Sequence, residues 1–316
     1  MTAPIFTGRI IAVIWDFDQT LIPGYQQAPL FNEYHVDPKD FWNEVNSLQA
    51  HYKNQGIEVS RDTLYLNHIL TYVREGRFSG LTNAKLRALG SSLAFHPGIP
   101  DFLKSLQESI STEFKSYEIT LEHYIVSTGL RQIMVGSSIN RYVTGIWGCE
   151  FIETPAPSGY LKTNSQAPAA EPVVTQVGYF LDNTSKTRAI WEINKGTNVN
   201  PRIDVNDQIA ESQRRVPIPH MLFIADGPSD VPVFSILNNF GGQTLGVYGD
   251  SSEHFEAVKT LQKQGRVKQI CHADYTRGSE ASRWIHSTVR DIALGIVQQT
   301  DRLVSSEVRR SPGHVT

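Results

Sequence analysis

The chain has 316 residues, a length that predicts about two domains and a core large enough to need no disulfide or structural metal. Hydrophobic residues make up 40% of the sequence and charged residues 19%, which excludes an intrinsically disordered chain. The net charge is −3 at pH 7, so the composition argues against a nucleic-acid partner. Cys149 and Cys271 have no metal-ligand spacing, which excludes a disulfide scaffold and favours a reducing compartment.

The sequence also gives no sign of a membrane or export segment. Its first residues carry no charged leader followed by a long apolar run. Elsewhere, no stretch reaches the roughly 18 consecutive apolar residues that a membrane-spanning helix needs. We therefore expect a cytoplasmic protein with no membrane partner.

Five short runs of β-branched and aromatic residues predict the strands of a parallel sheet. The first, residues 9–15, is apolar almost without interruption, as expected for a strand buried on both faces. Segments with helical spacing lie between the runs, and this alternation predicts a doubly wound, Rossmann-like α/β fold. Ligands in such folds bind beyond the carboxyl ends of the strands. The other runs are residues 124–127, 177–181, 221–225 and 245–248, and the helical segments include 99–106 and 187–193.

Residues 23–96 have a different pattern, with helical spacing and no strand-like run. Asp37 followed by a proline predicts a helix start, and Thr82 predicts another. We therefore predict an α/β core formed by residues 1–22 and 97–316, and a helical insert formed by residues 23–96. The apolar positions that recur on one helical face are Phe41, Val45, Leu48 and Tyr52, followed by Tyr65, Ile69, Tyr72 and Val73.

The first predicted strand ends in the sequence Asp16-Phe-Asp18-Gln-Thr20. Carboxylates at the carboxyl end of a buried strand can project into the crevice where such folds bind ligands. A carboxylate that attacks phosphorus needs a divalent cation to offset its repulsion from the phosphate. It also needs a neighbouring acid that protonates the leaving oxygen. An acidic pair alone is more often a helix cap or a solvated turn.

Polar residues also follow three later runs. Ser127-Thr-Gly129 leads from the second run toward a predicted helix, where hydroxyls and backbone N–H groups form an anion site. Lys186, early in the helix after the third run, offers a positive charge for a phosphate, although a lone lysine is usually solvated. Asp226 can complete an oxygen site for Mg²⁺ with Asp16. Asp230 can either orient Lys186 or hydrogen-bond a ligand of the metal.

In this order, the four motifs resemble those of the haloacid dehalogenase-like (HAD) hydrolase superfamily. Within it they are most similar to the phosphoserine phosphatase branch. The resemblance implies an enzyme, a Mg²⁺-dependent phosphatase, in which the helical insert is a cap on the α/β core. The matching motifs are Asp16-Phe-Asp18-Gln-Thr20, Ser127-Thr-Gly129, Lys186 and Asp226-Gly-Pro-Ser-Asp230.

The resemblance implies a role for each matching residue. Asp16 would attack phosphorus to form an aspartyl-phosphate, and Asp18 would act as general acid and then as general base. Ser127 and Lys186 would hold the phosphate oxygens. Mg²⁺ would be held by the carboxylates of Asp16 and Asp226 and by the backbone carbonyl of Asp18. The phosphate cradle would also include Thr20, Thr128 and Gly129.

The expected substrate is a small phosphorylated metabolite, which Tyr25 and Gln26 would contact. The phosphoserine phosphatase branch has a glutamate for the substrate amine nine residues after the nucleophile, whereas this chain has Tyr25, which argues against phosphoserine. The helical insert has equal numbers of basic and acidic residues, so it has no net field that would attract a polyanion. A phosphomutase or phosphotransferase of the same superfamily is one alternative. A non-catalytic binding protein on the same fold is the other.

Overall fold

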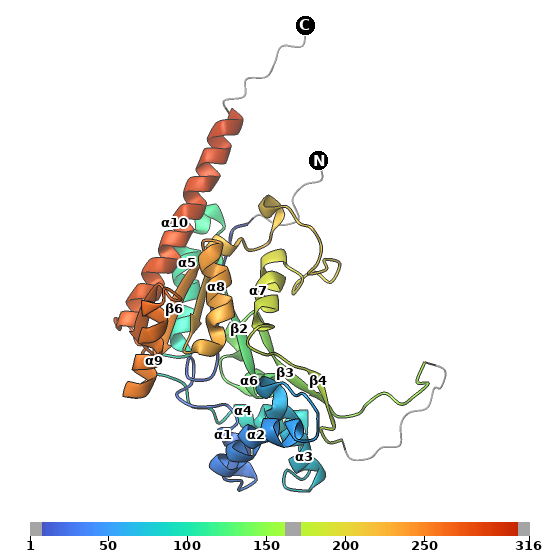
Figure 1. The fold of residues 1–316 in the computed structure, drawn as a ribbon. Coiled ribbons are helices and arrows are strands. Elements are labelled where there is room, and N and C mark those ends of the chain that lie inside the picture. Colours follow the sequence, from blue (N-terminus) through green and yellow to red (C-terminus); the bar gives the residue numbers. More distant parts are fainter. Residues whose placement is uncertain (1–7, 162–171, 309–316) are drawn as a thin grey trace.

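The protein is described by a computed structural model over residues 8–161 and 172–308. Its core is a seven-stranded sheet in the order β4-β3-β2-β1-β5-β6-β7, with helices on both faces (Figure 1). Neighbouring strands are parallel, except that β3 and β4 are antiparallel. The predicted doubly wound α/β core is therefore confirmed. The strands are β1 Ile10–Trp15, β2 Thr120–Leu130, β3 Gly145–Ile152, β4 Gln176–Tyr179, β5 Met221–Ala225, β6 Gln243–Tyr248 and β7 Gln269–His272.

Two apolar clusters cover the two faces of the sheet. On one face, Trp15 and Ile125 belong to a cluster that includes side chains of α5 and α10. On the other face, Ile14 and Phe223 belong to a cluster with α7, α8 and α9. Residues 11–15 of β1 are fully buried, because this strand lies in the middle of the sheet. The helices are α5 Asp101–Glu113, α6 Arg131–Gly136, α7 Lys186–Lys195, α8 Val231–Asn239, α9 Ser252–Lys263 and α10 Glu280–Val308.

One edge of the sheet differs from the prediction. The run at 177–181 was expected to form a buried strand, but β4 is an antiparallel edge strand, and Tyr179 is 39% exposed. An edge strand is open on one side, so its apolar residues need not indicate full burial. The strand beside it, β3, was not predicted because Gly145 and Gly148 interrupt its apolar pattern.

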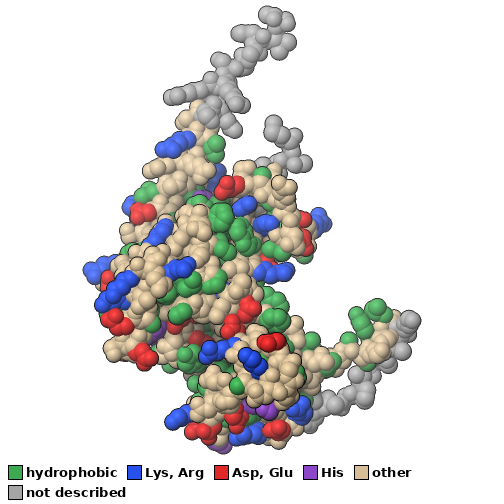
Figure 2. Space-filling model, viewed as in Figure 1, with side chains coloured by type: hydrophobic (Ala, Val, Ile, Leu, Met, Phe, Trp, Pro, Cys, Tyr) green, Lys and Arg blue, Asp and Glu red, His purple; other side chains and the backbone are tan. Residues whose placement is uncertain are grey.

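The helices of the helical insert gather beyond one end of the sheet (Figure 1). Figure 2 shows that the outline of the molecule narrows between this insert and the core. Asp37 accepts a hydrogen bond from the backbone N–H of Lys39, and Thr82 accepts one from Lys85, so both predicted helix starts are confirmed. The short helix α1 was not predicted. The helices are α1 Ala28–Glu33, α2 Pro38–Lys53, α3 Leu64–Arg74 and α4 Asn83–Gly90.

Close contact between α4 and α6 fixes the insert against the core. A Cβ atom on Gly90 would lie 2.0 Å from the carbonyl oxygen of Ile133, and one on Gly136 would lie 1.7 Å from that of Arg87. The two helices can therefore approach this closely only because both positions are glycine. Leu130 and Cys149 of the sheet also share an apolar cluster with Phe41 and Tyr72 of the insert. The division of the chain into a core and a separate cap domain stays a prediction.

No helix within the described residues is both long enough and apolar enough to cross a membrane.

A buried histidine on β2 gives the core a predicted sensitivity to acid. His123 is fully buried, accepts a hydrogen bond from the Trp15 indole at Nδ1 over 3.1 Å, and lies 3.0 Å from the Leu103 carbonyl at Nε2. Burial lowers the pKa of His123 to about 4. The unfolded chain binds the proton first as the pH falls, so this contribution to stability is complete above pH 6.5 and is lost toward pH 4.

We therefore expect protonation of this group to cost the wild type about 3 kcal/mol of unfolding free energy between these pH values. His123→Asn keeps an acceptor for the indole but does not titrate, so it should lose that much less on acidification. Urea unfolding at neutral and acidic pH measures the difference, with the exposed His51→Asn as control. An equal pH dependence in wild type and His123→Asn would contradict this assignment.

Candidate active site

Several of the predicted site residues lie together at the carboxyl ends of three adjacent strands. Asp16 follows β1, Asp226 follows β5, and Ser127 lies near the end of β2. Strand β1 pairs with both β2 and β5, so these ends lie side by side. Lys186 is the first residue of α7, and its side chain reaches the same end of the sheet. Elements far apart in the sequence therefore meet where a doubly wound sheet binds ligands.

Lys186 joins two of the carboxylates directly. Its Nζ donates to Asp16 Oδ1 over 2.9 Å and to Asp230 Oδ1 over 2.7 Å. The lysine side chain is only 1% exposed, so it is not the solvated lysine that was the alternative interpretation. Burial alone would lower the pKa of Lys186, but the charges of Asp16 and Asp230 raise it, so the amine stays protonated. Asp230 thus contacts Lys186 directly, and its hydrogen bond to a ligand of the metal stays a prediction.

The first motif begins by continuing the pairing of β1 and then turns away from the sheet. The backbone N–H of Asp16 donates to the Ile224 carbonyl over 2.9 Å, which continues the pairing of β1 with β5. The chain then turns, with Gln19 in the left-handed region at φ 59°. The turn places the carboxylate of Asp18 where it accepts a hydrogen bond from the backbone N–H of Gln26 over 2.9 Å. Asp16 is thus fixed by the sheet, whereas Asp18 is fixed by the segment that enters the helical insert.

Three carboxylates form a cluster that could hold a metal ion. Asp16, Asp226 and Asp230 each offer an oxygen, and these oxygens lie within 4.8 Å of one another. Burial raises the pKa of both Asp16 and Asp226. Burial, together with the charge of Asp16, raises the pKa of Asp230 to about 6. In their charged forms, three carboxylates would carry more negative charge than one lysine neutralises, and the raised pKa values show that the charged forms lack a sufficient stabilising partner here. A cation with hard oxygen ligands would supply that partner.

The side chain of Asp18 is not part of this cluster. Burial, and then the charge of Asp16, raises the pKa of Asp18 to about 8. At neutral pH this carboxyl group is therefore mainly protonated and can donate a proton. Coordination of a metal by the backbone carbonyl of Asp18 stays a prediction.

The second motif differs from the prediction in its local structure. Strand β2 continues through Ser127 to Leu130, and the six-residue helix α6 begins only at Arg131. The buried Ser127 hydroxyl accepts a hydrogen bond from the backbone N–H of Gly129 over 3.1 Å. The expected helix N-terminus is therefore not directly after Ser127. The pairing of β2 with β3 is irregular between Val126 and Leu130, so this part of the strand departs from regular geometry.

Two buried polar side chains near the motifs lack hydrogen-bond partners. The Thr20 hydroxyl oxygen and both amide atoms of Gln26 are buried and unpaired among the described residues. A Cβ atom on Gly129 would lie 1.8 Å from Gln26 Nε2, so the amide packs against the second motif. Unpaired buried polar groups are costly, and a bound ligand or water can satisfy them. Tyr25, by contrast, is 58% exposed.

Two further contacts of the site were not predicted. His254 in the first turn of α9 lies 3.3 Å from Asp226 Oδ2, and its Nδ1 accepts a hydrogen bond from Gly249 N–H over 3.1 Å. The Tyr65 hydroxyl donates to the Thr128 carbonyl over 2.6 Å, which ties the helical insert to the second motif. No motif spacing relates either residue to its partner. Tyr65 carried only the signal of an apolar helix face.

Comparison with known proteins gives a sequence relative that covers most of the chain. No family model matches the chain. An uncharacterized protein of Borreliella burgdorferi is 40% identical over 281 residues, which cover 88% of this chain and 95% of that protein. The chain belongs to the same family as this protein.

Solved structures with a similar arrangement share little sequence with the chain. A probable phosphoserine phosphatase from Vibrio cholerae has a TM-score of 0.49 at 10% identity, over 93% of this chain and 68% of that one. A HAD family hydrolase from Salmonella enterica serovar Typhi has a TM-score of 0.46 at 11% identity, over 84% and 68%. A phosphoserine phosphohydrolase-like protein from Francisella tularensis has a TM-score of 0.43 at 14% identity, over 83% and 94%.

Proposed function

We propose that the protein is a phosphatase of the HAD-like superfamily that hydrolyses a small phosphorylated metabolite through an aspartyl-phosphate on Asp16. The buried ion pairs of Lys186 with Asp16 and Asp230, beside Asp226, carry this proposal. These contacts hold residues of the first, third and fourth motifs together at the carboxyl ends of the strands. The helical insert is proposed to act as a cap on this end of the sheet.

Mg²⁺ is the proposed cofactor. The carboxylates of Asp16 and Asp226 and the backbone carbonyl of Asp18 would hold it, since hard oxygen donors are the ligands that Mg²⁺ prefers. Raised pKa values of Asp16 and Asp226 support this fit, because a cation would stabilise both carboxylates in their charged forms. When bound, Mg²⁺ would neutralise the repulsion between a carboxylate nucleophile and the phosphate.

Hydrolysis would then proceed in two steps on this chain's own residues. An Asp16 oxygen forms a bond to phosphorus while the bond from phosphorus to the leaving oxygen breaks, and Asp18 gives that oxygen its proton. Asp18, now a carboxylate, takes a proton from water as the water oxygen attacks phosphorus, which releases inorganic phosphate and restores Asp16. Ser127 and Lys186 would bind the phosphate oxygens throughout.

Phosphate release from a panel of phosphorylated metabolites with Mg²⁺ tests the proposal. We expect release by the wild type and none by Asp16→Asn. Faster phosphate transfer to an added acceptor than to water would instead identify a phosphomutase or phosphotransferase. No release and no transfer with any compound would favour the non-catalytic binding protein.

The role of Asp18 makes a separate prediction. Asp18→Asn should lower kcat by about 10²–10⁴-fold, because it removes the proton donor of the first step and the base of the second. Mg²⁺ affinity should be largely retained, since the backbone carbonyl is the proposed ligand. Steady-state kinetics together with a Mg²⁺ titration measure both quantities. If Mg²⁺ binding vanished in this variant, the assigned role would be wrong.

A further inference from the structure

The helical insert holds an apolar pocket next to the turn that follows the first motif. The pocket has a volume of about 420 Å³, within the range of small-molecule sites. Its walls come from the turn before α1, from α1 itself and from the first half of α2. None of the residues that line it is charged. They are Tyr25, Ala28, Phe31, Pro38, Trp42 and Asn46.

One wall of the pocket is connected to the proposed general acid through a hydrogen bond. Tyr25 and Ala28 line the pocket, and Gln26 between them donates its backbone N–H to Asp18. The Tyr25 carbonyl accepts a hydrogen bond from Ala28 N–H over 3.0 Å, so these residues form one tight turn. Burial and the charges of Asp226 and Asp18 raise the pKa of Tyr25, which fits a position close to both carboxylates.

Another wall of the pocket is linked to the second motif. The Trp42 ring packs against Tyr65, with 5.8 Å between ring centroids. Tyr65 in turn donates its hydroxyl to the Thr128 carbonyl, next to Ser127. The walls of the pocket are therefore connected to the proposed general acid, Asp18, and to Thr128 of the proposed phosphate-binding motif.

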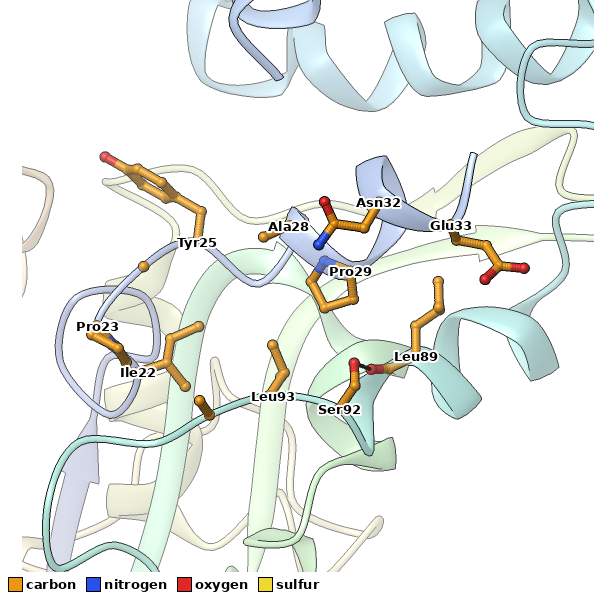
Figure 3. A pocket seen from close by; sticks show the side chains of 12 residues that line it. Ile22, Pro23, Tyr25, Ala28, Pro29, Asn32, Glu33, Leu89, Ser92 and Leu93 are labelled. Carbon is orange, nitrogen blue, oxygen red and sulfur yellow. Dashed lines mark hydrogen bonds between the residues drawn. The ribbon is translucent and has the colours of Figure 1, made fainter. Parts of the chain in front are cut away.

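A second cavity shares Tyr25 and Ala28 with this pocket, but its other walls are different. It has a volume of about 600 Å³ and is lined by residues 22–25, by α1 and by residues 89–94. Figure 3 shows that the Tyr25 ring points away from Pro29 and Leu93, which line this cavity. Its acidic residue, Glu33, is already paired with Lys85 over 2.9 Å. The aromatic walls of the smaller pocket therefore offer the better site for an organic group.

We propose that the pocket of Tyr25, Phe31 and Trp42 binds the leaving group of the substrate, and that this group is uncharged and apolar or aromatic. This inference rests on the proposed phosphatase function. The general acid must contact the leaving oxygen, and the turn that holds Asp18 also forms the pocket wall. A charged amine or carboxylate in the pocket would lose its hydration without gaining a partner of opposite charge. An apolar ring would be stabilised by burial against the aromatic walls.

Three esters of alcohols, benzyl phosphate, methyl phosphate and O-phospho-L-serine, test the selectivity. We expect kcat/KM for benzyl phosphate to exceed that of each of the others by about 10- to 100-fold. Trp42→Ala removes a pocket wall, and Ala28→Leu fills the pocket. Each should lower the ratio of benzyl to methyl phosphate kcat/KM by about tenfold. Trp284→Ala, which changes another half-buried tryptophan on α10, should leave the ratio unchanged.

A binding measurement separates this inference from the proposed function. Benzylphosphonate cannot be hydrolysed, and it should raise the melting temperature of the Mg²⁺-loaded wild type more than methylphosphonate does. That excess should disappear in Trp42→Ala. Preference for phosphoserine, or a ratio that Trp42→Ala does not change, would overturn the pocket assignment while Asp16-dependent hydrolysis persists. Failure of all three esters together with the metabolite panel would overturn the phosphatase proposal, and equal binding of the two phosphonates would overturn the pocket assignment.

Discussion

Asp16→Asn is expected to lower kcat for phosphate release by about 10⁴-fold or more, as loss of a nucleophile does in other covalent enzymes. An amide oxygen is a far weaker nucleophile than a carboxylate. Stability should not fall with activity, because burial already disfavours the charged form of Asp16. The variant keeps an oxygen that can accept from Lys186, whose charge Asp230 still balances. Phosphate release and thermal unfolding, measured on the same preparation, separate the two effects.

The control for Asp16→Asn is Asp291→Asn, which makes the same substitution at an exposed position on α10. This variant should keep wild-type activity and stability. Unchanged phosphate release by Asp16→Asn would contradict the assignment of Asp16 as nucleophile. A variant that no longer unfolds cooperatively would instead show that Asp16 is needed for the fold.

Lys186→Met should lower both activity and stability, because it removes the positive charge between Asp16 and Asp230. Removing one partner of a buried ion pair typically costs about 3–5 kcal/mol of unfolding free energy. We expect a loss of that size at pH 7 without Mg²⁺. The remaining carboxylates have raised pKa values in the folded state, so they bind protons more readily there than when unfolded. The loss should therefore shrink as the pH falls from 7 to 5. Urea unfolding at the two pH values measures it.

A double variant tests the cause of this loss. Lys186→Met with Asp230→Asn removes one uncompensated charge, so it should recover part of the unfolding free energy. It should not recover activity, since the phosphate still lacks its cationic partner, whose loss we expect to lower kcat by about 10²–10³-fold. A stability loss in Lys186→Met that is independent of pH and unchanged in the double variant would indicate lost packing instead.

The strands at the centre of the sheet could be predicted because burial on both faces leaves a continuous apolar run. Strand β1 shows this pattern, and its five final residues are fully buried. At the edge the pattern is ambiguous, so β4 was assigned the wrong environment and β3, with its two glycines, was missed. Helix starts at Asp37 and Thr82 were predictable because capping is local.

The candidate site was likewise predictable only in part. Asp16, Lys186 and Asp230 meet in the structure, and their motifs were predictable because each stands at or just beyond a strand end. The contact of His254 with Asp226 was not predictable, because it depends on how α9 packs after β6. The apolar pocket depends in the same way on packing between α1 and α2. The apolar helix faces of the insert could not show which aromatic rings would remain accessible.

The sequence separation of the site residues has a consequence for biosynthesis. The hydrogen bond between Asp16 and Lys186 spans 170 positions, and that between the Thr20 carbonyl and Tyr275 spans 255. Ribosomes add about 5–20 residues per second, so Asp16 is synthesised many seconds before Lys186 and Tyr275. During that interval β1 has no β5 beside it, and the amine of Lys186 is not yet next to Asp16. A nascent or truncated chain that ends before Asp230 therefore contains the proposed nucleophile but only part of the proposed site.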